Sequence, residues 1–333
     1  MQRIQNQILS LLASGSYSIW HVIDYQDASL PEFFEIIEEM EREGIIRIED
    51  GILSLTEKGK ELAKDKEFHD FQCKHCMGTG YDIWEDVKKE YEKIASERPL
   101  PDARYDQGYI SIDGVMRRLS FIFERGDLYG DIFIAGDDDL FSIAAGLSGL
   151  PSRIVVVEID ERLVNFINKI AGEYGLKVEA FLHDLQNDIG ELKKKFDVFV
   201  TDPVETLPGI TLFLSRCVEA LKGIGSAGYF GLTTLEASRH KWYEIQRILH
   251  EMGFVITDIR RKFNVYPDDG KNFFSFQQRL PVFKKIKKKN DYNWYKSSLY
   301  RIEAVKEPKA LVRGWQKLGE ALYHDDESWV TPE

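Results

Sequence analysis

The sequence predicts an α/β protein in which a doubly wound parallel sheet follows a small α+β domain. The chain has 333 residues, which is enough for two domains. Before residue 66, apolar residues recur at helical spacing and then alternate as in a hairpin. After residue 130, short apolar runs alternate with helical stretches, which is typical of a parallel sheet with helices on both faces.

The predicted small domain covers residues 1–66. Ile4 and Ile8 lie at helical spacing in its first helix, and a later helix begins after Ser29 with proline near its start. Residues 45–55 then alternate like a hairpin that turns at Asp-Gly. This order of elements resembles a winged helix, a fold that commonly binds DNA.

The later helix of this domain is strongly acidic. It carries Glu32, Glu35, Glu38, Glu39, Glu41 and Glu43 against the single base Arg42. These charges would repel phosphates. We therefore expect the small domain to serve in dimerisation or packing, and we expect no nucleic-acid partner.

Residues 67–100 are predicted to form a linker that contains a Cys-x-x-Cys sequence at Cys73 and Cys76. A tetrahedral zinc site needs four ligands, and the sequence offers no second pair of this kind. His69, His75 or a second subunit could complete such a site. A loop with free thiols explains the pair equally well, so no required metal is predicted.

The large domain is predicted over residues 101–280. An expected hairpin opens it, with strands at 109–112 and 119–123 on either side of Asp113 and Gly114. Continuous apolar runs predict parallel strands at 132–135, 154–157, 178–181, 198–200, 227–231 and 254–256. Helices are expected near 140–149, 161–174, 187–195, 211–222 and 236–252.

Residues 281–333 are predicted to be a flexible, aromatic and basic C-terminal region. Five lysines occur between residues 284 and 289, and a run of this kind is usually a solvated segment. Tyr292, Trp294 and Tyr295 follow it. These rings could close over a cationic ligand as a lid, through cation–π contacts.

The charge balance indicates what kind of partner the protein binds. The sequence contains 56 acidic and 44 basic residues, a formal net charge of −12, which suits a cationic partner and opposes a polyanion. Three cysteines are too few for a disulfide framework, and the N-terminal residues lack a secretion signal. Because no apolar run reaches membrane-spanning length, we expect a cytoplasmic protein without a membrane partner.

Acidic residues follow each of the first four parallel strands. The four strand ends are Gly136-Asp137-Asp138-Asp139, Glu158-Ile159-Asp160, His183-Asp184-Leu185 and Asp202-Pro203-Val204-Glu205. A single carboxylate in such a place is more often a helix cap, and the three aspartates could cap the next helix. Four acidic ends at one edge of a sheet are better explained by a ligand, because ligands bind outside the carboxyl ends of parallel strands.

This array resembles the Rossmann fold that binds S-adenosylmethionine, and residues 157–161 with Asp184 and Asp202-Pro203 are similar to the pattern of spermidine synthases. With the N-terminal pattern, the Gly136–Asp139 loop and the Cys-x-x-Cys segment, the chain resembles the branched-chain polyamine synthases. The resemblance implies aminopropyl transfer from decarboxylated S-adenosylmethionine to the internal secondary amine of spermidine. It also implies a homodimer that binds spermidine and other polyamines.

The acidic loop favours aminopropyl transfer over methyl transfer on physical grounds. S-adenosylmethionine would bring its carboxylate near three aspartates, whereas the decarboxylated form presents only a sulfonium and an ammonium. The Pro-Pro-aromatic signature of amino-methyltransferases is also missing, because Val204 and Glu205 follow Asp202-Pro203. Two alternatives stay open: a methyltransferase, and a winged-helix regulator that senses a metabolite.

The resemblance implies roles for individual residues. The donor is expected to contact Gln107, Gly136, Asp137, Asp138, Glu158, Asp184 and Leu185. Asp138 aligns with the aspartate that binds the aminopropyl amine, and Asp139, or alternatively Asp137, is expected to contact the attacking amine. The acceptor is expected to contact Asp139, Asp202, Glu205, Tyr292 and Trp294. The expected catalytic residues are Asp138, Asp139 and Asp202, with the base left open because spermidine synthases carry theirs further into the last loop.

Overall fold

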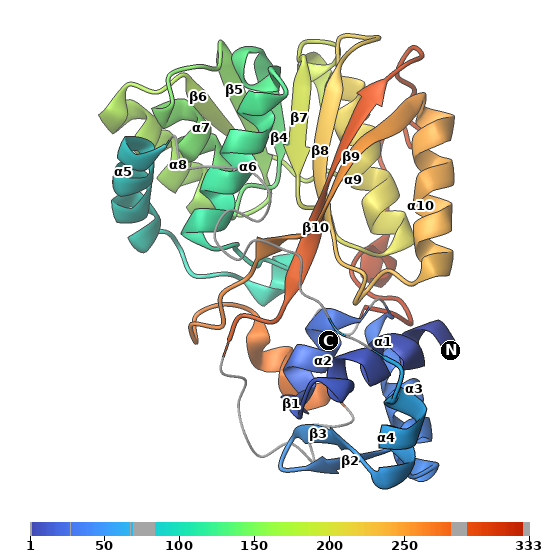
Figure 1. Cartoon of the computed structure of the whole chain (residues 1–333). Helices are drawn as coiled ribbons and strands as arrows, with labels where there is room; N and C mark the ends of the chain where they lie inside the picture. The colour runs from blue at the N-terminus through green and yellow to red at the C-terminus, as the bar shows by residue number, and fades with distance from the viewer. Residues whose placement is uncertain (1, 27, 67, 69–83, 281–291, 329–333) are drawn as a thin grey trace.

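The computed structural model describes residues 2–26, 28–66, 68, 84–280 and 292–328. Figure 1 shows a small α+β unit beneath a large α/β unit. The small unit contains α1 (Gln2–Ala13), β1 (Tyr17–Ser18), α2 (Ile19–Tyr25), α3 (Leu30–Arg42), β2 (Ile46–Glu49), β3 (Ile52–Leu55) and α4 (Glu57–Ala63). The expected helices and hairpin of this unit are therefore present.

The small unit packs its helices onto a three-stranded antiparallel sheet of order β1-β3-β2. Asp50 and Gly51 join β2 to β3 with positive φ, as the Asp-Gly turn requires. Thr56 caps α4 because its hydroxyl accepts a hydrogen bond from the amide of Gly59 at 3.1 Å. The apolar stripes of α1 and α3 are buried in the core of the unit.

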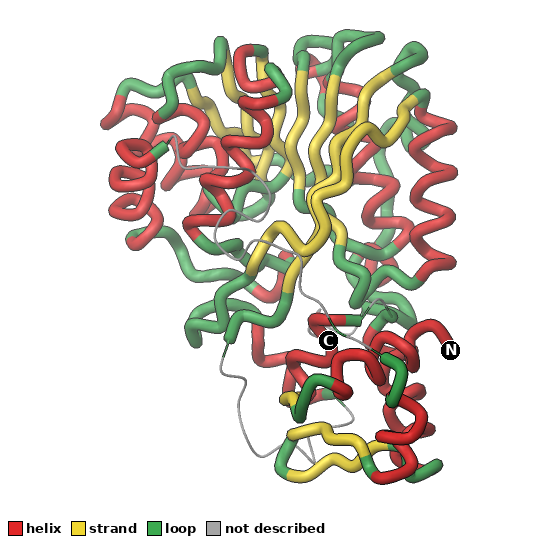
Figure 2. Tube along the Cα trace, viewed as in Figure 1, coloured by secondary structure: helices red, strands yellow, loops and turns green. Residues whose placement is uncertain are grey.

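The large unit is built on a seven-stranded sheet of order β6-β5-β4-β7-β8-β10-β9, which Figure 2 shows in yellow. Its strands are β4 (Asp131–Ala135), β5 (Arg153–Glu158), β6 (Val178–Leu182), β7 (Val198–Thr201), β8 (Ala227–Leu232), β9 (Phe254–Val265) and β10 (Lys296–Ala304). Strands β4 to β8 are parallel, and β10 runs antiparallel between β8 and β9. The predicted doubly wound α/β fold is confirmed.

Helices cover both faces of this sheet. Apolar residues of α6 (Ile112–Glu124), α7 (Phe141–Leu147) and α8 (Glu161–Tyr174) share one buried cluster with alternate strand residues. Those of α9 (Leu207–Ala220) and α10 (Arg239–Met252) share a second cluster with the opposite strand face. Strands β4, β5, β7 and β8 are buried on both sides, which is why they stand out in the sequence as continuous apolar runs, whereas the edge strand β6 has exposed residues.

The hairpin expected at 109–112 and 119–123 is wrong, because residues 112–124 form α6. Ser111 caps the helix by accepting a hydrogen bond from the amide of Gly114 at 3.1 Å. Asp113 and Gly114 therefore occupy a first helical turn instead of a strand-to-strand turn. The helix expected near 187–195 is also wrong, because only the short 3-10 helix η3 (Gly190–Leu192) forms there.

The expectation of a flexible C-terminal region is wrong for residues 296–304, which form β10. Strand β10 lies inside the sheet, and Leu299 and Ile302 on it are fully buried. The lysine run at 284–289 lies outside the described residues. Helix α5 (Glu85–Ser96), within the predicted linker, packs against α6 and α7 of the large unit.

The two units are joined near the start of β10. Trp20 of α2 packs on Trp294 with 4.8 Å between ring centroids, and both side chains are buried. The amide of Leu30 donates to the carbonyl of Leu235 at 2.8 Å, and Lys296 forms an ion pair with Asp24. In the part of the chain that the structure describes, no helix is long and apolar enough to span a membrane.

Candidate active site

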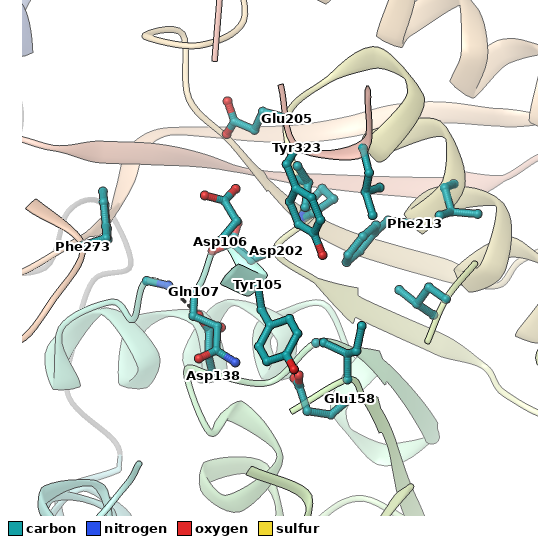
Figure 3. A pocket seen from close by; sticks show the side chains of 18 of the residues that line it. Tyr105, Asp106, Gln107, Asp138, Glu158, Asp202, Glu205, Phe213, Phe273 and Tyr323 are labelled. Atoms are coloured by element: carbon teal, nitrogen blue, oxygen red, sulfur yellow. Dashed lines mark hydrogen bonds between the residues drawn. The ribbon is translucent and has the colours of Figure 1, made fainter. Parts of the chain in front are cut away.

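A pocket opens at the carboxyl ends of the parallel strands, where the strand order reverses on either side of β4. Figure 3 shows side chains from several strand ends converging on it. Its lining includes Gln107, Gly136, Asp138, Glu158, His183, Asp184, Leu185, Asp202 and Glu205, and beside them Tyr105, Asp106, Phe213, Glu236, Tyr266, Phe273, Tyr295, Leu322 and Tyr323. Acidic and aromatic side chains therefore make up much of the wall.

The three aspartates after β4 point in different directions. Asp138 lines the pocket, and its carboxylate accepts a hydrogen bond from the amide of Gly108 at 2.7 Å. Asp137 is buried and accepts at 3.3 Å from the amide of Ser142 in the first turn of α7. Asp139 is buried on the other side, 2.8 Å from Arg118. Of this trio only Asp138 is among the residues that line the pocket.

Glu158, at the end of β5, is held by the backbone. Its carboxylate accepts hydrogen bonds from the amides of Asp137 at 3.0 Å and Asp160 at 2.9 Å. Gln107 is fixed nearby, because its amide nitrogen donates to Asp160 at 3.2 Å while its oxygen accepts from the amide of Asp102 at 2.7 Å. Glu158 is thus placed where carboxylates of this fold hold ribose hydroxyls.

The residues after β6 form the outer wall of this half of the pocket. Asp184 accepts a hydrogen bond from the amide of Gln186 at 2.8 Å, and the carbonyl of Leu185 accepts from the buried Arg216 at 2.8 Å. Arg216 also bonds the carbonyl of Gly314 in the C-terminal segment. This arrangement holds the segment that brings Tyr323 to the pocket.

Asp202, at the end of β7, occupies the centre of the acidic wall. The hydroxyl of Tyr266 donates to its carboxylate at 2.6 Å, and Arg118 lies 3.7 Å from the same oxygen atom. The opposite oxygen lies against Gly231 of β8, where a Cβ atom would be only 1.9 Å away. The absence of a side chain at Gly231 therefore gives the carboxylate its room.

Glu205 and Glu236 form a second acidic group. One oxygen of Glu205 accepts a hydrogen bond from the amide of Thr233 at 2.6 Å, and the other is buried and has no hydrogen-bond partner among the described residues. Glu236 also lines the pocket and is buried. In the view of Figure 3, Glu205 and Glu158 lie at opposite ends of the pocket.

Burial and mutual repulsion perturb these carboxyl groups. Desolvation raises the pKa of Asp138 well above its usual range, and the charges of Asp139 and Asp202 raise it further. Desolvation raises the pKa of Asp202 to about 6, although Arg118 pulls it down. Desolvation and then Glu236 raise the pKa of Glu205 well above its usual range. A cation in the pocket would relieve these costs.

The structure brings together most of the predicted site residues. Eight line the pocket: Gln107, Gly136, Asp138, Glu158, Asp184, Leu185, Asp202 and Glu205. Asp137 and Asp139 do not line it, because hydrogen bonds and an ion pair turn them into the protein. The geometry argues against the expectation that either contacts the attacking amine.

Of the three predicted lid residues, Tyr295 lines the pocket, whereas Tyr292 and Trp294 lie elsewhere. Trp294 is a fully buried core residue between the two units, and Tyr292 stacks on His21 with 3.9 Å between ring centroids. Neither belongs to the pocket lining. Cys73 and Cys76 lie outside the described residues. Within the described ranges, no group of three or more His, Cys, Asp or Glu side chains could hold a metal ion.

Sequence reasoning missed Glu236 and Tyr266, although the rule that ligands bind at the carboxyl ends of parallel strands could have found them. Glu236 follows β8, and Tyr266 follows β9 directly. Because β10 is antiparallel to both neighbours, β8 and β9 run in the same direction and end at one edge of the sheet. Tyr295 precedes β10 and so reaches the same edge. The residues of the C-terminal segment, such as Tyr323, left no comparable signal.

Comparisons with known proteins agree with this geometry. A family model for the C-terminal domain of branched-chain polyamine synthase A matches residues 86–330. An N(4)-bis(aminopropyl)spermidine synthase of Thermococcus kodakarensis is 39% identical, and the alignment covers 98% of this chain and 94% of the relative. The protein of the same name from Methanocaldococcus jannaschii is 38% identical, with the same coverage of both chains.

A solved structure is similar over almost the whole chain. It is the branched-chain polyamine synthase of Thermus thermophilus in complex with N4-aminopropylspermidine and 5′-methylthioadenosine. The two chains are 31% identical and superpose with a TM-score of 0.86, covering 98% of this chain and 92% of that chain.

Proposed function

This chain belongs to the branched-chain polyamine synthase family, and from this membership we propose that it transfers aminopropyl groups from decarboxylated S-adenosylmethionine to the internal secondary amine of spermidine. The observation that carries the proposal is the acidic and aromatic lining of one pocket at the carboxyl edge of the sheet. Carboxylates attract the ammonium groups of a polyamine, and aromatic faces attract the same cations.

The reaction we propose is a direct displacement. The lone pair of the acceptor nitrogen attacks the aminopropyl carbon bonded to sulfur, a C–N bond forms, and the C–S bond breaks with its electrons passing to sulfur. Neutral methylthioadenosine leaves, so the leaving group needs no acid. The acceptor nitrogen must shed a proton, because a protonated amine cannot attack.

Asp202 is our candidate for the group that takes this proton. It lies at the centre of the acidic wall, and the hydroxyl of Tyr266 fixes one of its oxygens. With a pKa raised by desolvation to about 6, Asp202 is ionised at neutral pH and can accept a proton more readily than an ordinary aspartate. We assign the catalytic role to Asp202 and not to Asp139.

The remaining lining residues divide between the two substrates. We propose that Glu158 binds the ribose hydroxyls, that Asp184 and Leu185 hold the adenine, and that Asp138 binds the aminopropyl ammonium. A carboxylate in the place of Asp138 also disfavours the carboxylated donor through repulsion. One oxygen of Glu205 is buried and has no hydrogen-bond partner in the described ranges, so Glu205 and Glu236 are placed to bind a terminal ammonium of the acceptor.

We propose a packing role for the small unit, which we interpret as winged-helix-like. The contact between Trp20 and Trp294 supports this role, and the exposed acidic side chains of Glu35 and Glu38 on α3 argue against a nucleic-acid partner. We further propose a cytoplasmic homodimer from a thermophile, consistent with 30% charged residues and with the prevalence of two-fold dimers. Light scattering of the purified protein tests the oligomeric state.

One incubation tests the proposed function. The full chain is mixed with spermidine and either decarboxylated S-adenosylmethionine or S-adenosylmethionine, and the products are analysed by mass spectrometry. We expect one or more aminopropyl units on spermidine, with methylthioadenosine released, from the decarboxylated donor alone. Fragmentation should place the new group on the internal nitrogen. A methyl gain that occurs only with the carboxylated donor would overturn the proposal.

A further inference from the structure

A buried arginine lies behind the wall of a pocket that we propose to bind cations. The side chain of Arg118, on α6, is only 3% exposed and lies 2.8 Å from Asp139 and 3.7 Å from Asp202. Its Nε and Nη2 atoms are buried and make no hydrogen bond within the described residues. A positive charge behind this wall repels a cationic substrate, so its presence at this position needs a functional explanation.

Asp139 is held in place on every side that the structure describes. Its Oδ1 atom accepts a hydrogen bond from the amide of Ile110 at 2.6 Å, and its Oδ2 atom accepts from Arg118. Its backbone carbonyl accepts from the hydroxyl of Tyr91 on α5. The carboxylate and the carbonyl of Asp139 are therefore fixed by Tyr91, Ile110 and Arg118 together.

We propose that Arg118 and Asp139 form a positioning pair that keeps Asp202 ionised and directed at the acceptor amine. This inference rests on the function proposed above. Arg118 supplies a fixed positive charge behind Asp202, and Asp139 balances part of it, so that the pocket keeps its negative character. Neither residue touches the substrate.

The charged and titratable groups around Asp202 come from several elements. Arg118 faces it from α6, Asp138 and Asp139 from the loop after β4, Tyr266 from the end of β9, and Glu205 lies on its own loop. Burial is the largest influence and raises the pKa of Asp202, Arg118 lowers it, and Asp139 raises it. The two members of the pair thus act on Asp202 with opposite signs.

Because Arg118 lowers and Asp139 raises the pKa of Asp202, removing each charge should shift the pH dependence of catalysis in opposite directions. A purely structural role for the two residues would not produce such opposite shifts. Asp202 accepts a proton only when ionised, so kcat/KM should fall as the pH drops through its pKa. This fall is the acid limb of the pH profile, and the neighbouring Asp138 contributes to it because the two carboxyl groups interact. The variant Arg118→Met should move this acid limb to higher pH, by about one pH unit for a charge at this range. Asp139→Asn should move it to lower pH. The double variant should return close to the wild-type limb.

Two variants serve as controls for the removal of the arginine charge. Arg118→Lys keeps the charge and should leave the limb unchanged. Arg301→Met removes another buried arginine, which lies 2.8 Å from Asp127 near the amino ends of the strands, and should also leave the limb unchanged. Binding of methylthioadenosine by each variant reports a folded donor site.

The pair can also be measured without turnover. A ¹³C NMR titration of protein with labelled aspartate carboxyl groups measures the pKa of Asp202 directly. The signal of Asp202 is identified as the one that is missing from the spectrum of Asp202→Asn. If the wild-type protein transfers no aminopropyl group, the proposed function fails while this titration still tests the pair. Shifts of the same sign in Arg118→Met and Asp139→Asn, or no shift in either, would overturn the inference. If Arg118→Met does not fold, the near-isosteric Asp139→Asn alone decides it by the sign of its shift.

Discussion

The space beside Gly231 yields a prediction about catalysis that the structure defines closely. A Cβ atom on this residue would lie 1.9 Å from Oδ1 and 2.9 Å from Cγ of Asp202, whereas ordinary contact begins at 3.4 Å. In Gly231→Ala the carboxylate must therefore move by about 1.5 Å. The end of an aspartate side chain can rotate, so we expect the fold to survive and the carboxylate to turn away.

That movement should cost more in rate than in stability. It breaks the 2.6 Å hydrogen bond from Tyr266, which is worth about 1.5–3 kcal/mol for a charged acceptor. A displacement of about 1 Å at a reacting group costs roughly 100-fold in rate. We expect kcat/KM for spermidine to fall at least about 100-fold, with methylthioadenosine affinity unchanged because Glu158 is untouched.

The assay compares Gly231→Ala with Gly172→Ala. Gly172 lies on α8 with nothing within 4 Å of its position for a Cβ atom and no positive φ, so the control should keep full activity. Turnover, methylthioadenosine binding and the free energy of unfolding are measured for both. If Gly231→Ala is folded and turns over at the wild-type rate, the central position assigned to Asp202 is wrong.

Three further predictions concern the other lining and core residues. Glu158→Gln replaces an acceptor of two backbone hydrogen bonds, so the Kd for methylthioadenosine should rise about 10-fold or more by calorimetry, and an unchanged Kd would count against the donor assignment. Glu236→Gln should raise the KM for spermidine but leave the Kd for methylthioadenosine unchanged. Trp294→Ala should lower the free energy of unfolding by about 3–5 kcal/mol in denaturant, while a changed KM with full stability would restore the lid interpretation.

The fold was predictable from the sequence where the local pattern of apolar residues matches the burial of the element in the folded protein. Strands β4, β5, β7 and β8 are buried on both faces, and their continuous apolar runs identify them. Helix α6 was not predicted, because Asp113 and Gly114 imitate a hairpin turn between apolar residues. Strand β10 was also missed, since it lies far along the chain from β9 and its position inside the sheet depends on long-range pairing alone.

The site was predictable from the ends of the parallel strands but not in its details. The rule that ligands bind at the carboxyl ends of parallel strands placed Asp138, Glu158 and Asp202 at one edge of the sheet, and all three line the pocket. It could not choose among three consecutive aspartates, because their directions depend on partners such as Ser142 and Arg118 that lie elsewhere in the chain. Only one of the trio lines the pocket.

The charge pattern of the pocket makes sense only together with the buried pair behind it. In the absence of a cation, burial and repulsion raise the pKa values of Asp138 and Glu205 well above their usual range, so these groups tend to hold protons. The same low-polarity surroundings strengthen the attraction to an ammonium group once one enters. Asp202 must remain ionised within this cluster to accept a proton, and Arg118, matched by Asp139, lowers its pKa without leaving an excess positive charge at the wall.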